Sequence, residues 1–245
     1  MESSQGWGRY EKSPMVEVAF QLHFPEILTI LTAPPAAFQE RIRAEYPLFQ
    51  ATQDRRGYVF AQQDRQAHVT LTYNTLTMTL SSFNEWGEVR QRFSNIESAF
   101  RAAYNPALYN RTGLRFRSLF RPHSYGISKL EWVKFVNGNV LGPFAVPNVK
   151  GMLASSKHEV VMSLAEGTGS DRFHLTHGFV TVTEPSKNQR SGEPGYLLDQ
   201  DYFTIESLQP ERAMTRLDRF NEEAARFFRL CVLDPLHQAM MPLAA

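Results

Sequence analysis

The chain has 245 residues, of which 42% are apolar and 21% charged, and these proportions are ordinary for a globular protein of one large domain or two smaller ones. Its 26 basic and 25 acidic residues leave a net charge of +1, which excludes a global field that draws the protein to nucleic acid or to an anionic membrane. The single cysteine excludes an internal disulfide framework, and no apolar stretch reaches the roughly 20 residues of a membrane-spanning helix. We therefore expect a cytoplasmic protein with no membrane partner, in which any anion site is local.

The first segments of the chain predict a strand followed by a helix. Residues 1–12 are polar and are expected to form a flexible N-terminal segment. From Met15 to Phe24 apolar and polar residues alternate, which predicts a strand with one buried face. The segment 34–46 begins with proline and carries apolar residues at helical spacing, so we expect a short helix there.

A meander and a long helix are predicted next. Strands separated by turn residues are expected at residues 57–63, 68–73 and 75–82. Residues 82–85 have the spacing of a capping box, and apolar residues then recur every three or four positions as far as Tyr104. This pattern predicts a helix whose apolar face is wide enough to cover a sheet.

The stretch from residue 111 to residue 121, which we call the arginine strand, is the most unusual feature of the sequence. At the strand period of two, one face receives the side chains of Arg111, Arg115, Arg117 and Arg121. Leucine and phenylalanine side chains occupy the other face. Because an unpaired buried charge costs several kcal/mol, the arginine face must be solvated, matched to carboxylates, or held open for an anion.

The middle of the chain has weaker signals. Residues 127–136 predict one or two helical turns, and the glycine- and proline-containing segment 138–151 predicts a linker. Three more strands are expected at residues 158–166, 172–183 and 196–206. A hairpin loop is expected at 166–171 and a longer polar loop at 187–194.

The strongest predicted helix runs from Pro210 to about Val232, on the strength of an apolar stripe at helical spacing. Its other face carries charges of both signs, among them Arg216 and Arg219. Mixed signs favour a solvated surface over a surface for nucleic acid.

The order of these elements predicts an α+β fold, with helices packed on one face of a mostly antiparallel sheet. The predicted strands and helices follow one another in a similar order in the two halves of the chain, which suggests two similar α+β halves. We place them at residues 13–137 and 138–245, either as separate units or within one continuous domain.

Two aspartates on a late strand are opposite in charge to the arginines of the arginine strand. Asp199 and Asp201 share one strand face, and Glu17 is the acidic residue of the first strand. Such carboxylates can act as general acid and base, as metal ligands, or as counter-charges of the arginine strand. The last interpretation is favoured because guanidinium binds carboxylate in two places. In that case Arg111 and Arg121, at the ends of the strand, are the ligand candidates if they lack carboxylate partners.

Other residue types give no support for a metal, a cofactor or catalysis. His174 and His177 are three apart in a predicted strand, so they point to opposite faces and cannot share a metal. The glycine-rich segment 167–170 lacks the lysine of a phosphate loop, and Cys231 lies in an apolar helical stripe. We expect no metal, no cofactor and no catalytic residue, which disfavours an enzyme and leaves the question open.

Three anchors give the chain a family resemblance. They are Pro-x-x-Glu ending at Glu17, Arg-x-Gly-Leu-Arg-aromatic at residues 111–116, and Leu-Asp-x-Asp at residues 198–201. In this order, over nearly the whole chain, they resemble the TIGR04255 family, a sporadically distributed group of uncharacterised bacterial proteins of about this length. That family often carries asparagine where this chain has Arg117. The resemblance implies a patchy distribution, typical of defence, toxin–antitoxin or mobile-element genes, and no known activity.

Three functions are therefore considered. The first is a non-catalytic binding protein, such as an accessory, antitoxin or immunity component, whose partner is another protein or a second copy in a homodimer. The second is a binder of a small anion, nucleotide or nucleic acid through the arginine face. The third and weakest is a phosphate-processing enzyme of the triphosphate-tunnel kind, since the Glu-x-Glu-x-Lys strand of such enzymes is not matched by Glu17, Ala19 and Gln21.

Overall fold

The computed structural model describes residues 9–52, 56–82, 85–127, 131–145, 155–164, 169–183 and 192–243. Its strands are β1 (Met15–His23), β2 (Leu48–Ala51), β3 (Gly57–Ala61), β4 (Ala67–Thr72), β5 (Thr75–Leu80), β6 (Arg111–Phe120), β7 (His158–Ser163), β8 (Asp171–Val182) and β9 (Glu193–Thr204). Its α-helices are α1 (Leu28–Thr32), α2 (Ala36–Ile42), α3 (Trp86–Tyr104), α4 (Gly138–Leu141), α5 (Ala213–Cys231) and α6 (Asp234–Ala239). Short 3-10 turns occur at Pro122–Tyr125, Trp132–Lys134, Gly142–Ala145 and Pro210–Arg212.

Within these ranges the strands form one sheet in the order β2-β3-β4-β5-β1-β6-β9-β8-β7. Every neighbouring pair is antiparallel. The predicted α+β fold with a mostly antiparallel sheet is thereby confirmed. None of the helices in the described ranges combines the length and the apolarity needed to cross a bilayer.

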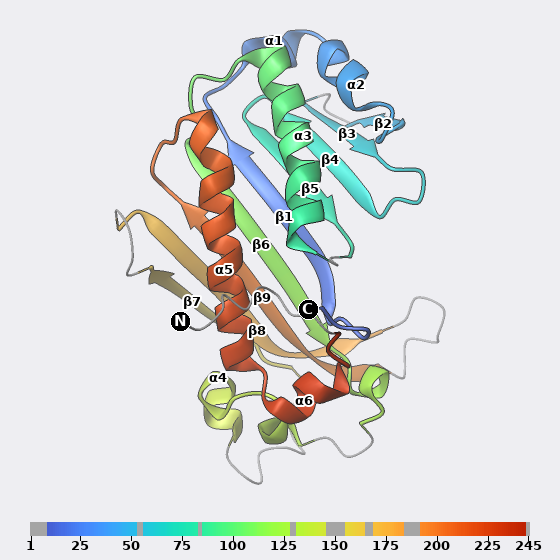
Figure 1. The fold of residues 1–245 in the computed structure, drawn as a ribbon, viewed down its shortest axis with the longest axis vertical. Helices are drawn as coiled ribbons and strands as arrows, with labels where there is room; N and C mark the ends of the chain where they lie inside the picture. Colours follow the sequence, from blue (N-terminus) through green and yellow to red (C-terminus); the bar gives the residue numbers. More distant parts are fainter. Residues whose placement is uncertain are drawn as a thin grey trace.

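The topology contains an internal repeat. Each half begins with a central strand, β1 or β6, and continues through short helices. The chain then returns as a meander from an edge of the sheet toward its centre. Each half ends in a long helix, α3 or α5 (Figure 1). The central strands pair antiparallel with each other, with Phe20 opposite Leu114. The second repeat of this topology therefore begins with β6, at Arg111, whereas composition suggested a division of the chain at residue 138.

The long helices α3 and α5 lie side by side across one face of the sheet (Figure 1). Alternation on β1 turns Val18, Phe20 and Leu22 toward these helices, where all of them are fully buried. The ring of Phe20 stacks on that of Phe93 from α3, with centroids 4.7 Å apart. Burial of such apolar surface, worth about 25 cal/mol per Å², holds the helical layer on the sheet.

Some local predictions differ from the structure. Helix α3 begins at Trp86 with extended Glu85 as its N-cap, and Glu85 forms no side-chain capping hydrogen bond. The capping box at 82–85 is therefore wrong, although its residues 83 and 84 lie outside the described ranges. Helix α1 and strand β2 were not predicted, and part of the expected linker forms α4.

Other predicted segments lie partly outside the described residues. These are the N-terminal segment at 1–8, the helical turns at 128–130, the rest of the linker at 146–151, the hairpin loop at 166–168 and the polar loop at 187–191.

Candidate functional site

The face of the sheet opposite α3 and α5 is lined by polar side chains, and we call it the open face. Because side chains alternate along a strand, the residues between the buried apolar positions point to this face. On β1 they are Glu17, Ala19, Gln21 and His23, which are all partly exposed. On β5 they are Thr75, Thr77 and Thr79.

The arginine strand forms the centre of the open face. On β6, Leu114, Phe116 and Phe120 are buried under the helices, whereas the arginine side chains point the other way. Strands β1 and β9 flank β6, with Glu17 opposite Arg117 and Asp201 opposite Arg115. The register therefore brings the predicted carboxylates beside the predicted arginines.

Arg115 and Asp199 form the closest ion pair of this face. The Nε and Nη2 groups of Arg115 donate to the two carboxylate oxygens of Asp199 at 2.7 and 2.5 Å. These bonds to Asp199 raise the pKa of the Arg115 guanidinium, while burial opposes them. Arg117 lies between two carboxylates, with its Nε 3.4 Å from Asp199 Oδ2 and its Nη1 3.5 Å from Glu17 Oε1.

Arg111 is held by three neighbours. Its Nη2 donates to Asp201 Oδ2 at 2.9 Å, its Nη1 donates to the side chain of Gln21, and its guanidinium lies 4.4 Å from the ring centroid of Phe203. A Cβ at Gly113 would stand 2.9 Å from Arg111 Nη1, so glycine leaves the space in which the guanidinium lies. A larger residue at position 113 would therefore displace the flexible end of the Arg111 side chain.

Arg121 also has a carboxylate partner. Its Nε lies 3.5 Å from Glu193 Oε2, and Glu193 is the first residue of β9. Sequence reasoning missed Glu193 because the region before residue 195 reads as a loop. Both arginines at the ends of the strand are therefore matched, and neither is the unpartnered ligand candidate that the sequence left open.

The charges around the arginine strand are balanced, and they lie at different depths below the surface. The four arginines face four carboxylates, namely Glu17, Glu193, Asp199 and Asp201. The side chain of Asp199 is only 7% exposed, whereas that of Arg115 is 45% exposed, so the guanidinium lies outermost. Burial raises the pKa of Asp201, and the nearby Arg111 and Arg115 guanidiniums lower it.

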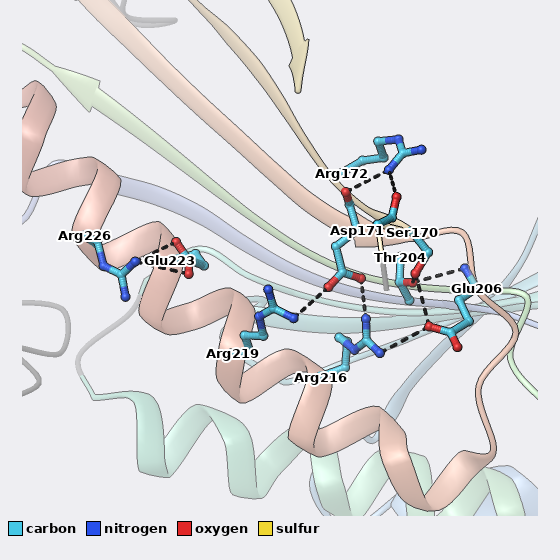
Figure 2. Close-up of polar contacts among 10 residues, drawn as sticks. Ser170, Asp171, Arg172, Thr204, Glu206, Arg216, Arg219, Glu223 and Arg226 are labelled. Atoms are coloured by element: carbon cyan, nitrogen blue, oxygen red, sulfur yellow. Dashed lines mark hydrogen bonds and ion pairs between the residues drawn. The ribbon is translucent and has the colours of Figure 1, made fainter. Parts of the chain in front are cut away.

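A second charge cluster lies at the ends of β8, β9 and α5, and Figure 2 shows its side chains. Arg216 and Arg219 reach from α5 to Asp171, which is 1% exposed, with Arg219 Nη1 3.3 Å from Asp171 Oδ2. Glu206 accepts from Ser170 Oγ at 3.1 Å and lies 3.5 Å from Arg216 Nη2.

This second cluster corrects one prediction. The arginine side chains at 216 and 219 were expected on a solvated face of the helix, but they neutralise a buried carboxylate. Such burial depends on how α5 crosses the end of β8, and periodicity within a helix carries no signal of it.

The histidine and cysteine predictions can be compared with the structure directly. His174 contacts Glu159 on the open face, with 2.7 Å between Nε2 and Oε1, and His177 is buried beside Tyr196, so the two histidines do point to opposite faces. Burial raises the pKa of the Cys231 thiol to about 12, as expected of an unreactive cysteine. In the described ranges, no group of three or more histidine, cysteine, aspartate or glutamate side chains is arranged to hold a metal ion.

No family model and no curated protein matches this sequence. The resemblance to the TIGR04255 family therefore stays a prediction.

Proposed function

We propose that this chain is a non-catalytic interaction protein that binds another protein through the open face of its sheet. The observation that carries the proposal is the pairing of every arginine of the arginine strand with a carboxylate on the face of the sheet opposite α3 and α5. The family resemblance adds the proposal of an accessory, antitoxin or immunity role in a mobile bacterial defence system.

Charge balance favours a protein as the partner. A face with equal numbers of guanidiniums and carboxylates has little net attraction for a polyanion, because each nearby carboxylate repels phosphate. It offers donors and acceptors of both signs, and such patterns select a partner by complementary placement of charges.

The same pairing argues against proton-transfer chemistry at the two aspartates. A general base must lie within hydrogen-bonding reach of the proton that it abstracts. Both oxygens of Asp199 accept from Arg115, and Asp201 is bonded to Arg111. These carboxylates are placed to hold guanidiniums.

A capture experiment tests the proposal. Three tagged proteins are used to capture partners from extracts of the source cells, and any captured protein is identified and purified. They are wild type, a Thr77→Arg variant on the open face, and a Gln91→Glu variant at an exposed position of α3. We expect wild type and Gln91→Glu to bind the purified partner equally and Thr77→Arg to bind at least tenfold more weakly. Equal binding by all three proteins, with the fold of each verified by circular dichroism, would contradict the open face as the partner surface.

An anion or nucleic-acid ligand is the second candidate, because the guanidinium of Arg115 lies outside its carboxylate partner. Labelled single-stranded DNA, single-stranded RNA and a nucleotide panel are titrated into wild type and an Arg115→Gln, Arg117→Gln variant. Binding that weakens with salt and is lost in a folded variant would favour this candidate. The protein-partner proposal expects no binding and no ligand-induced shift in melting temperature.

A further inference from the structure

Strand β7 forms one edge of the sheet and carries exposed apolar side chains. Among the strands that the structure describes it pairs with β8 alone, and Val160, Val161 and Met162 are 43%, 60% and 38% exposed. Soluble proteins commonly protect an edge strand with proline, a bulge or several charges. In β7 the pairing with β8 is regular from end to end, and Glu159 is its one charged side chain apart from histidine.

The backbone of β7 presents a defined set of groups to its outer side. Ser156 N–H donates to Phe179 O, and Leu164 N–H donates to Asp171 O, so the even-numbered residues direct their backbone groups toward β8. Along an antiparallel strand, consecutive residues alternately direct their backbone N–H and C=O groups toward one neighbouring strand and toward the opposite side. Glu159, Val161 and Ser163 therefore direct their N–H and C=O groups away from the sheet.

These outward groups are self-complementary about Val161. When a second β7 pairs antiparallel with Val161 opposite Val161, Glu159 meets Ser163 of the other copy, and all three of these positions have outward backbone groups. No like charges then stand opposite each other, and the carboxylate of Glu159 faces a hydroxyl donor. A two-fold axis through Val161 relates the two copies, which is the symmetry of an isologous dimer.

The apolar side chains of β7 suit the same pairing. Val160 and Met162 lie opposite Leu175 and Phe173, which are buried on the helical side of the sheet. In the symmetric pair Val160 meets Met162 of the second copy in both directions, since their positions are equidistant from Val161. The apolar layer under the helices then continues across the junction, and the exposed surface of both residues is removed from water.

We propose that two copies of this chain associate through antiparallel pairing of their β7 strands about Val161, giving one sheet that is continuous through the dimer. The partner is a second copy of this chain, and the interface lies along the β7 edge of the sheet, separated from the arginine strand by β9 and β8. Pairing of main-chain groups supplies the affinity, and the apolar pairs supply the register.

The oligomeric state of the full chain tests this proposal. The molar mass is measured by sedimentation velocity and by light scattering for wild type, Val161→Pro, Val161→Lys and Val161→Thr. Proline removes an outward N–H without breaking a bond to β8, and lysine places like charges on the two-fold axis, so we expect both variants to be monomers. Wild type and Val161→Thr are expected to be dimers. A monomeric wild type at 100 µM or a fully dimeric, folded Val161→Lys would overturn the proposal.

Cross-linking tests the register independently of affinity. Hydrogen-bonded antiparallel neighbours have Cα atoms about 5.5 Å apart, within disulfide range. Val161→Cys is expected to form a disulfide-linked dimer under mild oxidation, and the native Cys231 is buried and does not compete. As a matched control, Phe49→Cys on the exposed edge strand β2 should not cross-link. Head-to-tail pairing of β7 with β2 of another copy would give open-ended oligomers, and Phe49→Lys would abolish them. That result would contradict the symmetric dimer.

Discussion

Asp199 is the residue on which the arginine strand depends most. It is buried, it binds Arg115 with both oxygens, and it lies 3.4 Å from Arg117. Replacing it leaves two guanidiniums without this partner while the rest of the sheet stays in place.

We expect Asp199→Ala to lower the free energy of unfolding by about 2 kcal/mol, as measured by urea denaturation. The matched variant Glu17→Ala removes a more exposed carboxylate at 3.5 Å and is expected to cost about 0.5 kcal/mol or less. Similar costs for the two variants would show that the pairs of this face contribute as ordinary surface ion pairs.

The pH dependence of stability can be predicted at His177. Burial lowers the pKa of His177, and the stacked ring of His158 lowers it further. A folded-state pKa below the unfolded value of about 6.5 means that the unfolded chain takes up the proton first, so stability is lost as pH falls below about 6.5.

We expect wild type to lose more free energy of unfolding between pH 7.5 and 5.5 than His177→Gln, whose amide can still form a hydrogen bond with Tyr196. Urea denaturation at both pH values measures this difference. His23 and His237, whose pKa values are also lowered by burial, remain in both proteins and cancel in the comparison. An equal loss in both proteins would assign the acid sensitivity to other groups.

At the residue scale, the sequence predicted the charge pairs whose partners both lie within strongly alternating strands. Alternation placed the arginines on one face of their strand and Asp199 and Asp201 on one face of theirs, and the pairing of the two sets was the favoured interpretation. Glu193 was missed because Pro194 interrupts the strand pattern, although β9 extends through it. Asp171 was missed because its burial arises from a helix more than 40 residues later in the chain.

At the scale of elements, the contact between α3 and α5 joins the helices that close the two repeats. Asp218 on α5 accepts from Arg90 Nε at 2.6 Å, from Arg90 Nη2 at 2.9 Å and from Trp86 Nε1 at 2.9 Å. Bidentate geometry of this kind is the case in which a partly exposed ion pair adds stability.

A double-mutant cycle measures the interaction energy between Arg90 and Asp218. We expect Arg90→Ala and Asp218→Ala to be coupled by about 1 kcal/mol in the free energy of unfolding. The same cycle on Arg226 and Glu223, an exposed pair three residues apart on α5, should give about 0.3 kcal/mol. If the two coupling energies are equal, the bidentate geometry between α3 and α5 adds no stability beyond that of an exposed surface ion pair.

Long periodic elements were predicted closely, and short ones were not. The apolar stripes of α3 and α5 and the alternation of β1 and β6 indicated these elements because each buries a regular face. Strand β2 has four residues and exists through its pairing with β3, and α1 has five residues, so neither has a periodic signal of its own. Sheet order also depends on tertiary pairing, and the antiparallel meeting of β1 with β6 was not predictable from local pattern.

At the scale of the whole molecule, one sheet runs through both repeats, and we expect one cooperative unfolding transition. Trp86 reports on the packing of the first repeat and on its contact with α5, and Trp132 reports on the second repeat. With Trp7→Phe as background, single Trp86→Phe and Trp132→Phe variants leave one reporter each. Their fluorescence transitions in urea should coincide with each other and with circular dichroism. Two separated midpoints would show that the repeats unfold as independent domains.

The position of the central strands also has a consequence for synthesis on the ribosome. Strand β1 emerges early, but its neighbour β6 lies about 90 residues later, and the outer side of β6 waits in turn for β9. Until then each nascent repeat exposes the backbone of its innermost strand, which is a surface that other unfinished chains can join. Such long-range closure slows folding, so the yield of native protein should depend on translation speed and on chaperones more than that of a protein whose strands pair only with their sequence neighbours.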